Sequence, residues 1–589
     1  MGLLRLLCLG IGVLTAGQAV ADGCNLNQFG TLQVEMIGYR PTTMIKINGA
    51  DTRFIIDTGA FFNSMSSATA DALKLDSRYS PFGFRITGVG GDAKAKIASV
   101  KDFGIIGTTL HDVDFIVGGT DIRYGLLGVN LLNAADLEID LAGGKMILFR
   151  AKDCDEANLA YWVKEGGEYN VADLDPSDNS GERSISLTVM VNGKKVRAEI
   201  DSGAGATVIS RSAAERVGIN LNAPDTKTGS QNYGIGTRAV KSWIANIDSF
   251  SVGTETIRHS QMQVIDGDIL GDTEMLLGVD FLLAHHMLVA NSLGKIYFSY
   301  NGGRIFSLAT APADSGKSDV DTAADDKSTA PKTANDYALL GEAHLSRGET
   351  KAALADLDEA IRMAPDQASY YAARAQTQAR LKQPAAALAD VDKSLNLDPK
   401  NVDTVLLRAE IRADANDHQG AMADTATAAS LIPPGSGEAR SIADLYIHLE
   451  EPAAALPVLD GWIKSHDNDG LLGSTLNERC WASGLSNQRL EDALEDCRKA
   501  IARDGENGAY LDSLGMVELR LGHYAESIKA YQKALASKSE FAWTRYGLGI
   551  ARLRDGQTEA GNADLAAARA LDPQIDALAQ KYGLTAAAP

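Results

Sequence analysis

The chain has 589 residues and a formal net charge of -21 at pH 7. A chain of this length is expected to hold several domains. The acidic balance argues against nucleic acid or an anionic membrane surface as a partner, because both repel a negatively charged protein.

Residues 1–21 have the features of a secretory signal. Arg5 supplies the positive start, residues 6–16 are mostly apolar, and residues 19–21 read AVA, a small-x-small cleavage pattern. The apolar run is too short to span a bilayer, and no later run in the sequence is long enough for a membrane helix. We therefore expect an exported, periplasmic protein with a Gram-negative-type signal, whose mature chain begins near Asp22 and has no membrane span.

Two stretches, at about residues 30–150 and 183–305, alternate strand-like runs with Gly-rich turns, as is typical of β domains. They repeat each other in order. Each has an Asn-Gly turn nine residues before an Asp, then Asp-Thr/Ser-Gly-Ala, a Gly-rich segment, Leu-Leu-Gly and a closing Gly-Lys turn. The Asp turns read FIIDTGA at residues 54–60 and AEIDSGA at residues 198–204. This ordered series of matches indicates a duplicated domain.

The two Asp turns favour one kind of chemistry. If Asp57 and Asp201 lie face to face, both cannot ionise easily, because like charges a few ångströms apart repel. The pair then shares a proton, so one carboxylate can act as a general base on water while the other polarises a carbonyl. The glycine of each triplet allows a sharp turn, and the Thr or Ser hydroxyl can bridge across the twofold.

A single Asp-Thr/Ser-Gly triplet is weak evidence, because it is expected by chance in chains of this length. Residues 314–316 form the same triplet, but no apolar strand precedes them and they lie in a low-complexity stretch. We interpret that triplet as a chance occurrence.

Together these features resemble the retropepsin-like aspartic proteases, over about residues 30–305, roughly half of the chain. That family shows an apolar strand leading to Asp-Thr/Ser-Gly-Ala, a glycine-rich flap, and an apolar-apolar-Gly triplet before a short helix; both copies carry all three parts. The resemblance implies closed β barrels, a polypeptide substrate under the flaps, and no metal or other cofactor. The implied site residues are the catalytic Asp57 and Asp201, the supporting Thr58, Gly59, Ser202 and Gly203, the flap residues Gly88, Val89, Gly90, Gly234, Ile235 and Gly236, and Gly128 and Gly278 beside the Asp turns.

Two points stay open at the level of sequence. Proteases of this family usually work as dimers of one-Asp subunits, so the two copies here form either an internal pseudo-dimer, the simpler arrangement, or pairs with their equivalents in a second chain. The first copy also departs from the pattern, because residues 61–66 read FFNSMS where residues 206–210 of the second read ATVIS. If that departure distorts the site, the domains would be a polypeptide-binding scaffold rather than a protease.

From residue 335 to about 575 the sequence is rich in Ala and Leu and has a 34-residue period, marked by Pro365, Pro399 and Pro433. Small residues recur at fixed offsets before these positions, where the two helices of a hairpin would touch, and Pro ends the second helix. This half resembles tetratricopeptide repeats, about seven of them, which expose a groove for a peptide or a protein partner.

Signal cleavage would leave four cysteines, and an even number allows two disulfides in an exported protein. Cys24 and Cys154 flank the first β domain, whose two ends the resemblance places side by side; the alternative is two unpaired buried thiols. Cys480 and Cys497 fall at facing positions of one helical repeat, where a disulfide or two small core residues would fit. A lipid on Cys24 is the less favoured alternative, since the residues before it fit a lipidation box poorly.

The expected fold is therefore multidomain, with two all-β acid-protease barrels forming a pseudo-twofold pair and an all-α repeat solenoid. The expected order is a signal peptide (1–21), a first barrel (22–150), a connecting loop (151–182), a second barrel (183–305), a flexible linker (306–334), repeats (335–575) and a C-terminal tail (576–589). The expected function is an exported aspartic endopeptidase whose repeats recruit a substrate or partner. The alternative is a non-catalytic scaffold that binds polypeptide.

Overall fold

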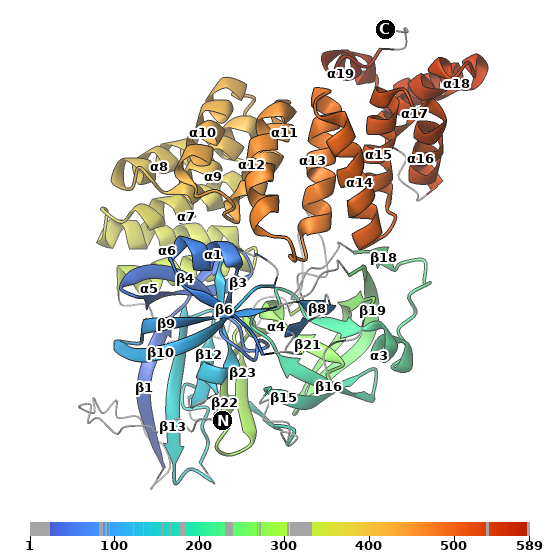
Figure 1. Cartoon of the computed structure of the whole chain (residues 1–589). Helices are drawn as coiled ribbons and strands as arrows, with labels where there is room; N and C mark the ends of the chain where they lie inside the picture. The colour runs from blue at the N-terminus through green and yellow to red at the C-terminus, as the bar shows by residue number, and fades with distance from the viewer. Residues whose placement is uncertain are drawn as a thin grey trace.

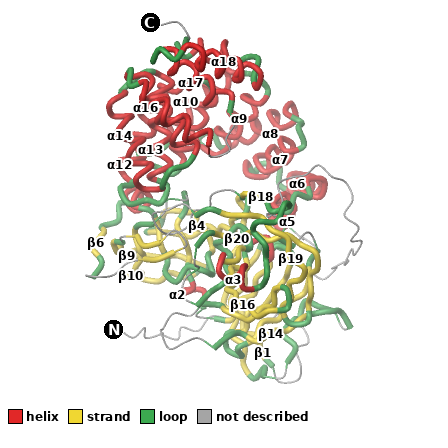
Figure 2. The backbone as a smooth tube through the Cα atoms, turned by 90° about the vertical axis from the view of Figure 1, so that its right-hand side faces the viewer, coloured by secondary structure: helices red, strands yellow, loops and turns green. Residues whose placement is uncertain are grey.

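The computed structural model describes residues 24–585 except 82–85, 89–90, 94, 120, 122, 134, 156, 165, 177–183, 230–239, 268, 270–271, 303–304, 307–332 and 537–540. Strands form one half of the molecule and helices the other, and the helices arch over one end of the β half (Figure 1). The same separation is clear at right angles to that view (Figure 2). The prediction of two all-β barrels followed by an all-α repeat array is confirmed. The predicted signal peptide and most of the predicted linker lie outside the described residues.

Six strands close the first barrel, because its first and last members also pair with each other. Two short strands, β2 (Glu35–Ile37) and β6 (Ser77–Tyr79), extend the sheet. The barrel strands in spatial order are β3 (Arg40–Ile47), β4 (Ala50–Ile56), β11 (Gly125–Leu127), β5 (Ser64–Met65), β10 (Thr108–Val117) and β9 (Lys96–Ile105).

The second barrel repeats this arrangement strand for strand, with β18 (Lys227–Thr228) in the place of β6. The turns that open the two barrels also match, since Asn48 and Asn192 have φ of 51° and 49° and each is followed by a glycine with positive φ. That conformation is the one in which an Asn-Gly pair joins two strands directly. The barrel strands in spatial order are β15 (Ser186–Val191), β16 (Lys194–Ile200), β21 (Met275–Leu277), β17 (Val208–Ser210), β20 (Glu255–Ile265) and β19 (Ser242–Val252).

A third, six-stranded sheet joins the two barrels. Its central pair, one strand from each domain, aligns Glu138 with Leu288 in an antiparallel register. The order is symmetric about that pair, so the internal twofold runs through the sheet. The strands in order are β1 (Asn25–Gln33), β13 (Lys145–Lys152), β12 (Asp136–Asp140), β22 (His285–Ala290), β23 (Lys295–Tyr300) and β14 (Asn170–Asp173).

The shared sheet corrects the prediction that residues 151–182 are only a connecting loop. β13 continues to Lys152, and β14 (Asn170–Asp173) lies within the segment and pairs with β23. β14 occupies the position in the second domain that β1 occupies in the first. It covers the backbone groups at the edge of β23, which would otherwise remain without partners.

In the helical half, consecutive helices pack as hairpins through small residues. A Cβ atom at Gly341 or Gly549 would lie 2.8 Å from Leu357 or Leu565 of the second helix of its hairpin. Within the described residues, no helix is long and apolar enough to cross a membrane. The helices are α5 (Ala334–Ser346), α6 (Thr350–Met363), α7 (Ala368–Arg380), α8 (Pro384–Leu397), α9 (Val402–Asp414), α10 (His418–Leu431), α11 (Glu438–His448), α12 (Pro452–Ser465), α13 (Leu472–Ser486), α14 (Leu490–Asp504), α15 (Gly508–Leu521), α16 (Tyr524–Ala536), α17 (Ala542–Arg554), α18 (Thr558–Leu571) and α19 (Ile575–Lys581).

The helix α19 corrects the prediction of a tail from residue 576. Ile575 and Ala579 are buried in the core of the last repeats, and Leu584 follows them there. A terminal repeat exposes an apolar face unless a further element covers it, and α19 provides that cover.

Both cysteine pairs are bonded, Cys24 to Cys154 and Cys480 to Cys497. The first bond links the start of β1 to the end of β13 across 130 residues, and the second joins α13 to α14 across 17 residues.

Removing the longer-range disulfide should destabilise the protein more than removing the shorter one. Closing a longer loop takes more entropy from the unfolded chain, about 5 kcal/mol for the first bond and about 3 kcal/mol for the second. Urea unfolding of the two double Cys→Ser variants, which leave no free thiol behind, measures both losses. Equal midpoints would contradict this ordering.

Candidate active site

The same local structure places each aspartate. β4 runs parallel to β11, and β16 runs parallel to β21. At the ends of these pairs the N–H of Asp57 donates to the carbonyl of Leu127 at 2.9 Å, and that of Asp201 donates to Leu277 at 3.0 Å. Each Asp therefore sits where a barrel strand ends, held by the strand that carries the Leu-Leu-Gly triplet.

Each carboxylate is fixed by the backbone of its own turn. Oδ1 of Asp57 accepts from the N–H groups of Gly59 at 3.0 Å and Ala60 at 2.9 Å. Oδ1 of Asp201 accepts from the corresponding N–H groups at 2.8 Å and 3.0 Å. One oxygen of each carboxyl group is thus occupied by its own turn.

Four hydrogen bonds lock the two turns together. The hydroxyl of Thr58 donates to the carbonyl of Ile200 at 2.7 Å and accepts from the N–H of Ser202 at 2.9 Å. The hydroxyl of Ser202 donates to the carbonyl of Ile56 at 2.6 Å and accepts from the N–H of Thr58 at 3.1 Å. Thr58 and Ser202 are each 0% exposed. The predicted bridge between the domains therefore lies within one chain, as the internal pseudo-dimer requires.

The two turns approach so closely that only glycine fits beside each carboxylate. A Cβ at Gly59 would lie 2.4 Å from Cγ of Asp201, and a Cβ at Gly203 would lie 2.3 Å from Cγ of Asp57. Real Cβ atoms do not make contacts of that length. The structure therefore brings together all six of the predicted aspartates and supporting residues.

Burial and mutual repulsion favour a proton on this pair. Burial, and then the charge of Asp201, raise the pKa of Asp57 well above its usual value, and a hydrogen bond between the two carboxyl groups raises it further. Burial also raises the pKa of Asp201, while the N–H donors of its turn and the hydrogen bond with Asp57 lower it in part. Burial and mutual repulsion therefore favour one proton shared between the two carboxyl groups.

These shifts predict that the aspartate pair makes the protein less stable as pH rises. A carboxyl whose pKa is higher in the folded state binds more protons there than in the unfolded chain, so the free energy of unfolding falls above the usual pKa of 3.8. The slope is at most about 1.4 kcal/mol per pH unit for each group. Asp57→Asn should flatten this decline in thermal unfolding between about pH 4 and pH 7; an unchanged slope would contradict the assignment.

Gly128 and Gly278 lie where the sequence places them, against the Asp turns. A Cβ at Gly128 would lie 2.6 Å from the carbonyl oxygen of Ala60, and a Cβ at Gly278 would lie 2.4 Å from the backbone carbon of Ala206. The short helices α2 (Val129–Leu132) and α4 (Val279–Leu282) begin directly after these glycines.

The sequence reasoning missed a polar link beside each of these glycines. Thr207 donates from its N–H and its hydroxyl to Asp280 at 2.8 and 2.7 Å, and its hydroxyl accepts from the N–H of Gly278 at 3.1 Å. Burial raises the pKa of Asp280 to about 6. The sequence held a signal for this link, because Thr207 follows the Asp, and Asp280 the Gly, at the same sequence spacing as the corresponding residues of the first copy.

The first domain makes the same link with amide side chains. Asn63 replaces Thr207, and its Oδ1 accepts from the N–H of Gly128 at 2.9 Å, while Oδ1 of Asn130 accepts from the N–H of Asn63 at 3.2 Å. The polar character of residues 61–66, which left a distorted site open, is thus used to build the same support.

The flap residues are described only in part. Gly88 ends β7 (Ile86–Gly88) and pairs with Gly91 of β8 (Gly91–Ala93) in a two-stranded hairpin. Val89, Gly90, Gly234, Ile235 and Gly236 lie outside the described residues.

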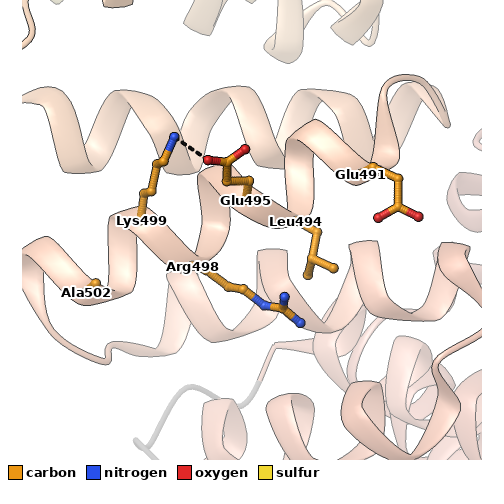
Figure 3. Close-up of a pocket in the computed structure, with 6 residues that line it drawn as sticks. All are labelled: Glu491, Leu494, Glu495, Arg498, Lys499 and Ala502. Carbon is orange, nitrogen blue, oxygen red and sulfur yellow. Dashed lines mark ion pairs between the residues drawn. The ribbon is translucent and has the colours of Figure 1, made fainter.

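A shallow hollow lies on one face of α14 in the helical half, where Lys499 pairs with Glu495 at 2.6 Å (Figure 3). Its lining comes from that helix alone and is exposed except for the buried Leu494. Among the described residues, no group of three or more His, Cys, Asp or Glu side chains is arranged to hold a metal ion.

Comparison with known families agrees with this architecture. Residues 43–134 and 187–284 match the family described as "gag-polyprotein putative aspartyl protease", and residues 337–367 and 509–541 match the tetratricopeptide repeat. The chain therefore carries two tandem retropepsin-like aspartyl protease domains followed by tetratricopeptide repeats.

Solved structures with similarity to the chain include tetratricopeptide repeat proteins. One from Parabacteroides merdae is 14% identical, with 43% of this chain and 98% of that chain covered and a TM-score of 0.34. The TPR2B domain of yeast Sti1, in complex with pHsp70, is 25% identical, with 20% of this chain and 96% of that chain covered and a TM-score of 0.19. No curated protein matches the chain.

Proposed function

We propose that this protein is an aspartic endopeptidase that hydrolyses peptide bonds with a water molecule activated between Asp57 and Asp201. The observation that carries the proposal is the meeting of two buried carboxyl groups, from two domains of one chain, across four hydrogen bonds between Thr58 and Ser202 and the facing turns. A structural pair of loops has no need of two mutually repelling carboxyl groups, since amides would make the same hydrogen bonds to the turns without the cost of burying charge.

A buried pair that shares one proton divides two roles between its carboxyl groups. The ionised member takes a proton from water as the water oxygen attacks the peptide carbonyl carbon. The protonated member donates its proton to the carbonyl oxygen, which gives a tetrahedral diol. Collapse of the diol breaks the C–N bond, and a proton passes to the leaving amine. Gly59 and Gly203 lie against the facing carboxylates, so no side chain of either glycine position comes between the turns and the two carboxyl groups.

The proposed substrate is an extended polypeptide. The hairpin of β7 and β8 is the kind of element that holds such a chain by main-chain hydrogen bonds, which gives weak sequence preference. The repeats extend the surface available to a polypeptide substrate or a protein partner. Neither nucleic acid nor a metal cofactor enters the proposed reaction.

We further propose that the protein works after export, in the periplasm. The features of residues 1–21 and the two disulfides support an oxidising compartment. Intact mass of the protein secreted by a Gram-negative host tests this proposal, with a mature chain beginning at Asp22 expected and a retained N-terminus contradicting it.

The experiment that tests the proposed activity is cleavage of an unfolded protein by the purified mature chain from about pH 4 to pH 8. Mass spectrometry of the products should show internal cleavage with a maximum on the acidic side, where the pair holds one proton. Absence of cleavage across this range, with binding of the same polypeptide retained, would leave a polypeptide-binding scaffold instead.

A further inference from the structure

The helical half is bound to the first protease domain through a buried cluster of charged groups. Asp121, in the connection between β10 and β11, is 5% exposed, and His466 and Asp469, in the connection between α12 and α13, are 4% and 2% exposed. Nε2 of His466 lies 2.7 Å from Oδ2 of Asp121, and the N–H of Asp121 donates to Oδ2 of Asp469 at 2.5 Å. We call these three residues the interdomain cluster.

Both ring nitrogens of His466 face acceptors. Nδ1 lies 2.7 Å from the carbonyl of Trp462, and Nε2 faces the carboxylate of Asp121. A neutral imidazole has only one N–H and satisfies one of the two, whereas the imidazolium satisfies both. Beside an ionised Asp121 the geometry therefore favours the charged imidazolium, and loss of its proton leaves one buried acceptor without a donor.

The groups around His466 define its electrostatic setting. The ring of Trp462, in α12, stacks on the imidazole of His466 with centroids 4.0 Å apart. The guanidinium of Arg440, in α11, lies over the Trp462 ring, 5.9 Å from its centroid. From α14, Arg503 donates to the backbone carbonyl of Asp469 at 2.5 Å. The charged groups around His466 are thus Asp121, Asp469, Arg440 and Arg503.

A second set of contacts runs from the helical half towards the catalytic turn. Arg123 pairs with Asp403 of α9 and with Glu438 of α11, the latter at 3.2 Å. Its guanidinium lies 5.7 Å from the ring centroid of Tyr124. Tyr124 packs against the small apolar cluster that contains Ala60, whose N–H holds the carboxylate of Asp57. The helices are therefore connected to the Asp57 turn through Arg123, then Tyr124, then the apolar cluster of Ala60.

The helical half also touches the β half at its first helix. The hydroxyl of Ser346 donates to the carbonyl of Gly38 at 2.6 Å, beside β2. Glu342 is half-buried at the same contact, with its Oε2 atom out of contact with solvent, and there burial and the charge of Glu35 raise its pKa well above the usual range. The two contacts, at α5 and at the interdomain cluster, hold the repeat array across the end of the β half (Figure 1).

We propose that the helical half is an intramolecular positioning element for the first catalytic turn, docked through Asp121 and Arg123, and that the proton on His466 sets how firmly it is docked. Asp121, Arg123 and His466 are positioning residues that act through Tyr124 on the Asp57 turn. Their effect on catalysis rests on the proposed function, whereas the docking of the two halves does not.

The sign of the pH dependence follows from the charged imidazole. Burial opposes protonation, but the hydrogen bond to Asp121 and its charge outweigh burial and raise the pKa of His466 above 6.5. A group whose pKa is raised in the docked state stabilises docking below its free pKa and loses that stabilisation as pH rises through the docked pKa. Burial also raises the pKa of Asp469 to about 6, so its ionisation weakens docking in the same direction.

Separation of the two halves tests the docking without any need for activity. A recognition site for a specific protease is inserted between residues 307 and 332 of the full chain, the folded protein is cut there, and association of the halves is measured by analytical ultracentrifugation from about pH 5.5 to pH 8. Glu342→Gln is present in every sample, because its ionisation at the α5 contact would also weaken association as pH rises. The dissociation constant of this parent should rise about tenfold or more over the range.

His466→Gln should bind more weakly than the parent at the acidic end and should lose most of the pH dependence. Asp121→Asn, on the other half of the molecule, should do the same, which separates the effect from misfolding of the helices. His448→Gln is the matched control, since His448 is exposed on the neighbouring helix α11. A pH dependence that is unchanged in both His466→Gln and Asp121→Asn would overturn the proposal.

Activity of the uncut protein then tests the positioning. Arg123→Ala should raise KM for an unfolded substrate about tenfold, with a smaller change in kcat. Arg123→Lys should rescue KM in part, because lysine restores the positive charge but not the planar guanidinium with its paired N–H donors. Unchanged KM and kcat would overturn the positioning role. If the wild type cleaves nothing, the proposed function fails while the association measurements still decide the docking.

Discussion

Asp57→Asn and Asp201→Asn should each reduce cleavage of an unfolded protein by at least about 10³-fold. Each substitution removes one member of the proton-sharing pair, whose two carboxylates are each held by two N–H groups of their own turn. The amide oxygen can still accept from the turn, so both variants should fold. Initial rates at the pH optimum, with far-UV circular dichroism of each variant, make the comparison.

The chain offers a control of matched local sequence. Asp314 belongs to the third Asp-Ser-Gly triplet, so Asp314→Asn is the same chemical change in the same tripeptide and should leave the rate unchanged. Loss of activity in only one of the two catalytic variants would contradict the internal pair and indicate that one domain pairs with its equivalent in a second chain.

Removal of both bridging hydroxyls, by Thr58→Val with Ser202→Ala, should destabilise the β half and lower cleavage together. The double variant leaves the carbonyls of Ile56 and Ile200 and two backbone N–H groups buried without partners. At about 1 kcal/mol or more for each group, the loss of unfolding free energy is at least about 4 kcal/mol. Displacement of the turns by about 1 Å is enough to reduce the rate about 10²-fold.

Urea unfolding and cleavage rates of the two single variants and the double variant complete a double-mutant cycle. The losses in the two single variants should be strongly non-additive. When one hydroxyl is removed and its turn moves, the other hydroxyl already loses part of its hydrogen bonds. Thr188→Val is the control, since Thr188 is an exposed strand residue, and its effect should stay within about 0.5 kcal/mol. Additive losses in the cycle would mean that the two turns do not support each other.

The residues whose placement could be predicted from the sequence are those that lie in a short local pattern. Asp57 and Asp201 could be paired because each ends an apolar run before a tight turn, and the second copy repeats the first. Gly128 could be placed against the Asp turn because a glycine in a strand marks close approach of another backbone segment. In each case a few neighbouring residues determine the geometry.

The features that the sequence did not predict depend on partners far away in the chain. β14 (Asn170–Asp173) has little apolar character of its own and exists because β23 needs a partner at its edge. His466 and Asp121 are 345 residues apart, and neither lies in a motif. Docking of two domains is determined by surfaces that form only after each has folded, so no local periodicity signals it.

Residues 61–66, which differ most from the family pattern, could also not be interpreted without their partners. Their polar side chains suggested a distorted site. In the structure, however, the amide oxygen of Asn63 accepts from the N–H of Gly128, as the hydroxyl of Thr207 accepts from that of Gly278. A polar side chain at a buried position can be read correctly only when its partner is known.

The measurement that tests the internal catalytic pair most directly is a mixing experiment. Asp57→Asn and Asp201→Asn proteins are combined at equal concentration, allowed to exchange, and assayed beside the active wild type. A pair formed within one chain predicts that the mixture stays as inactive as either variant alone, because every molecule lacks one aspartate. Recovery of cleavage in the mixture would show that Asp57 of one chain meets Asp201 of another, and would contradict the account.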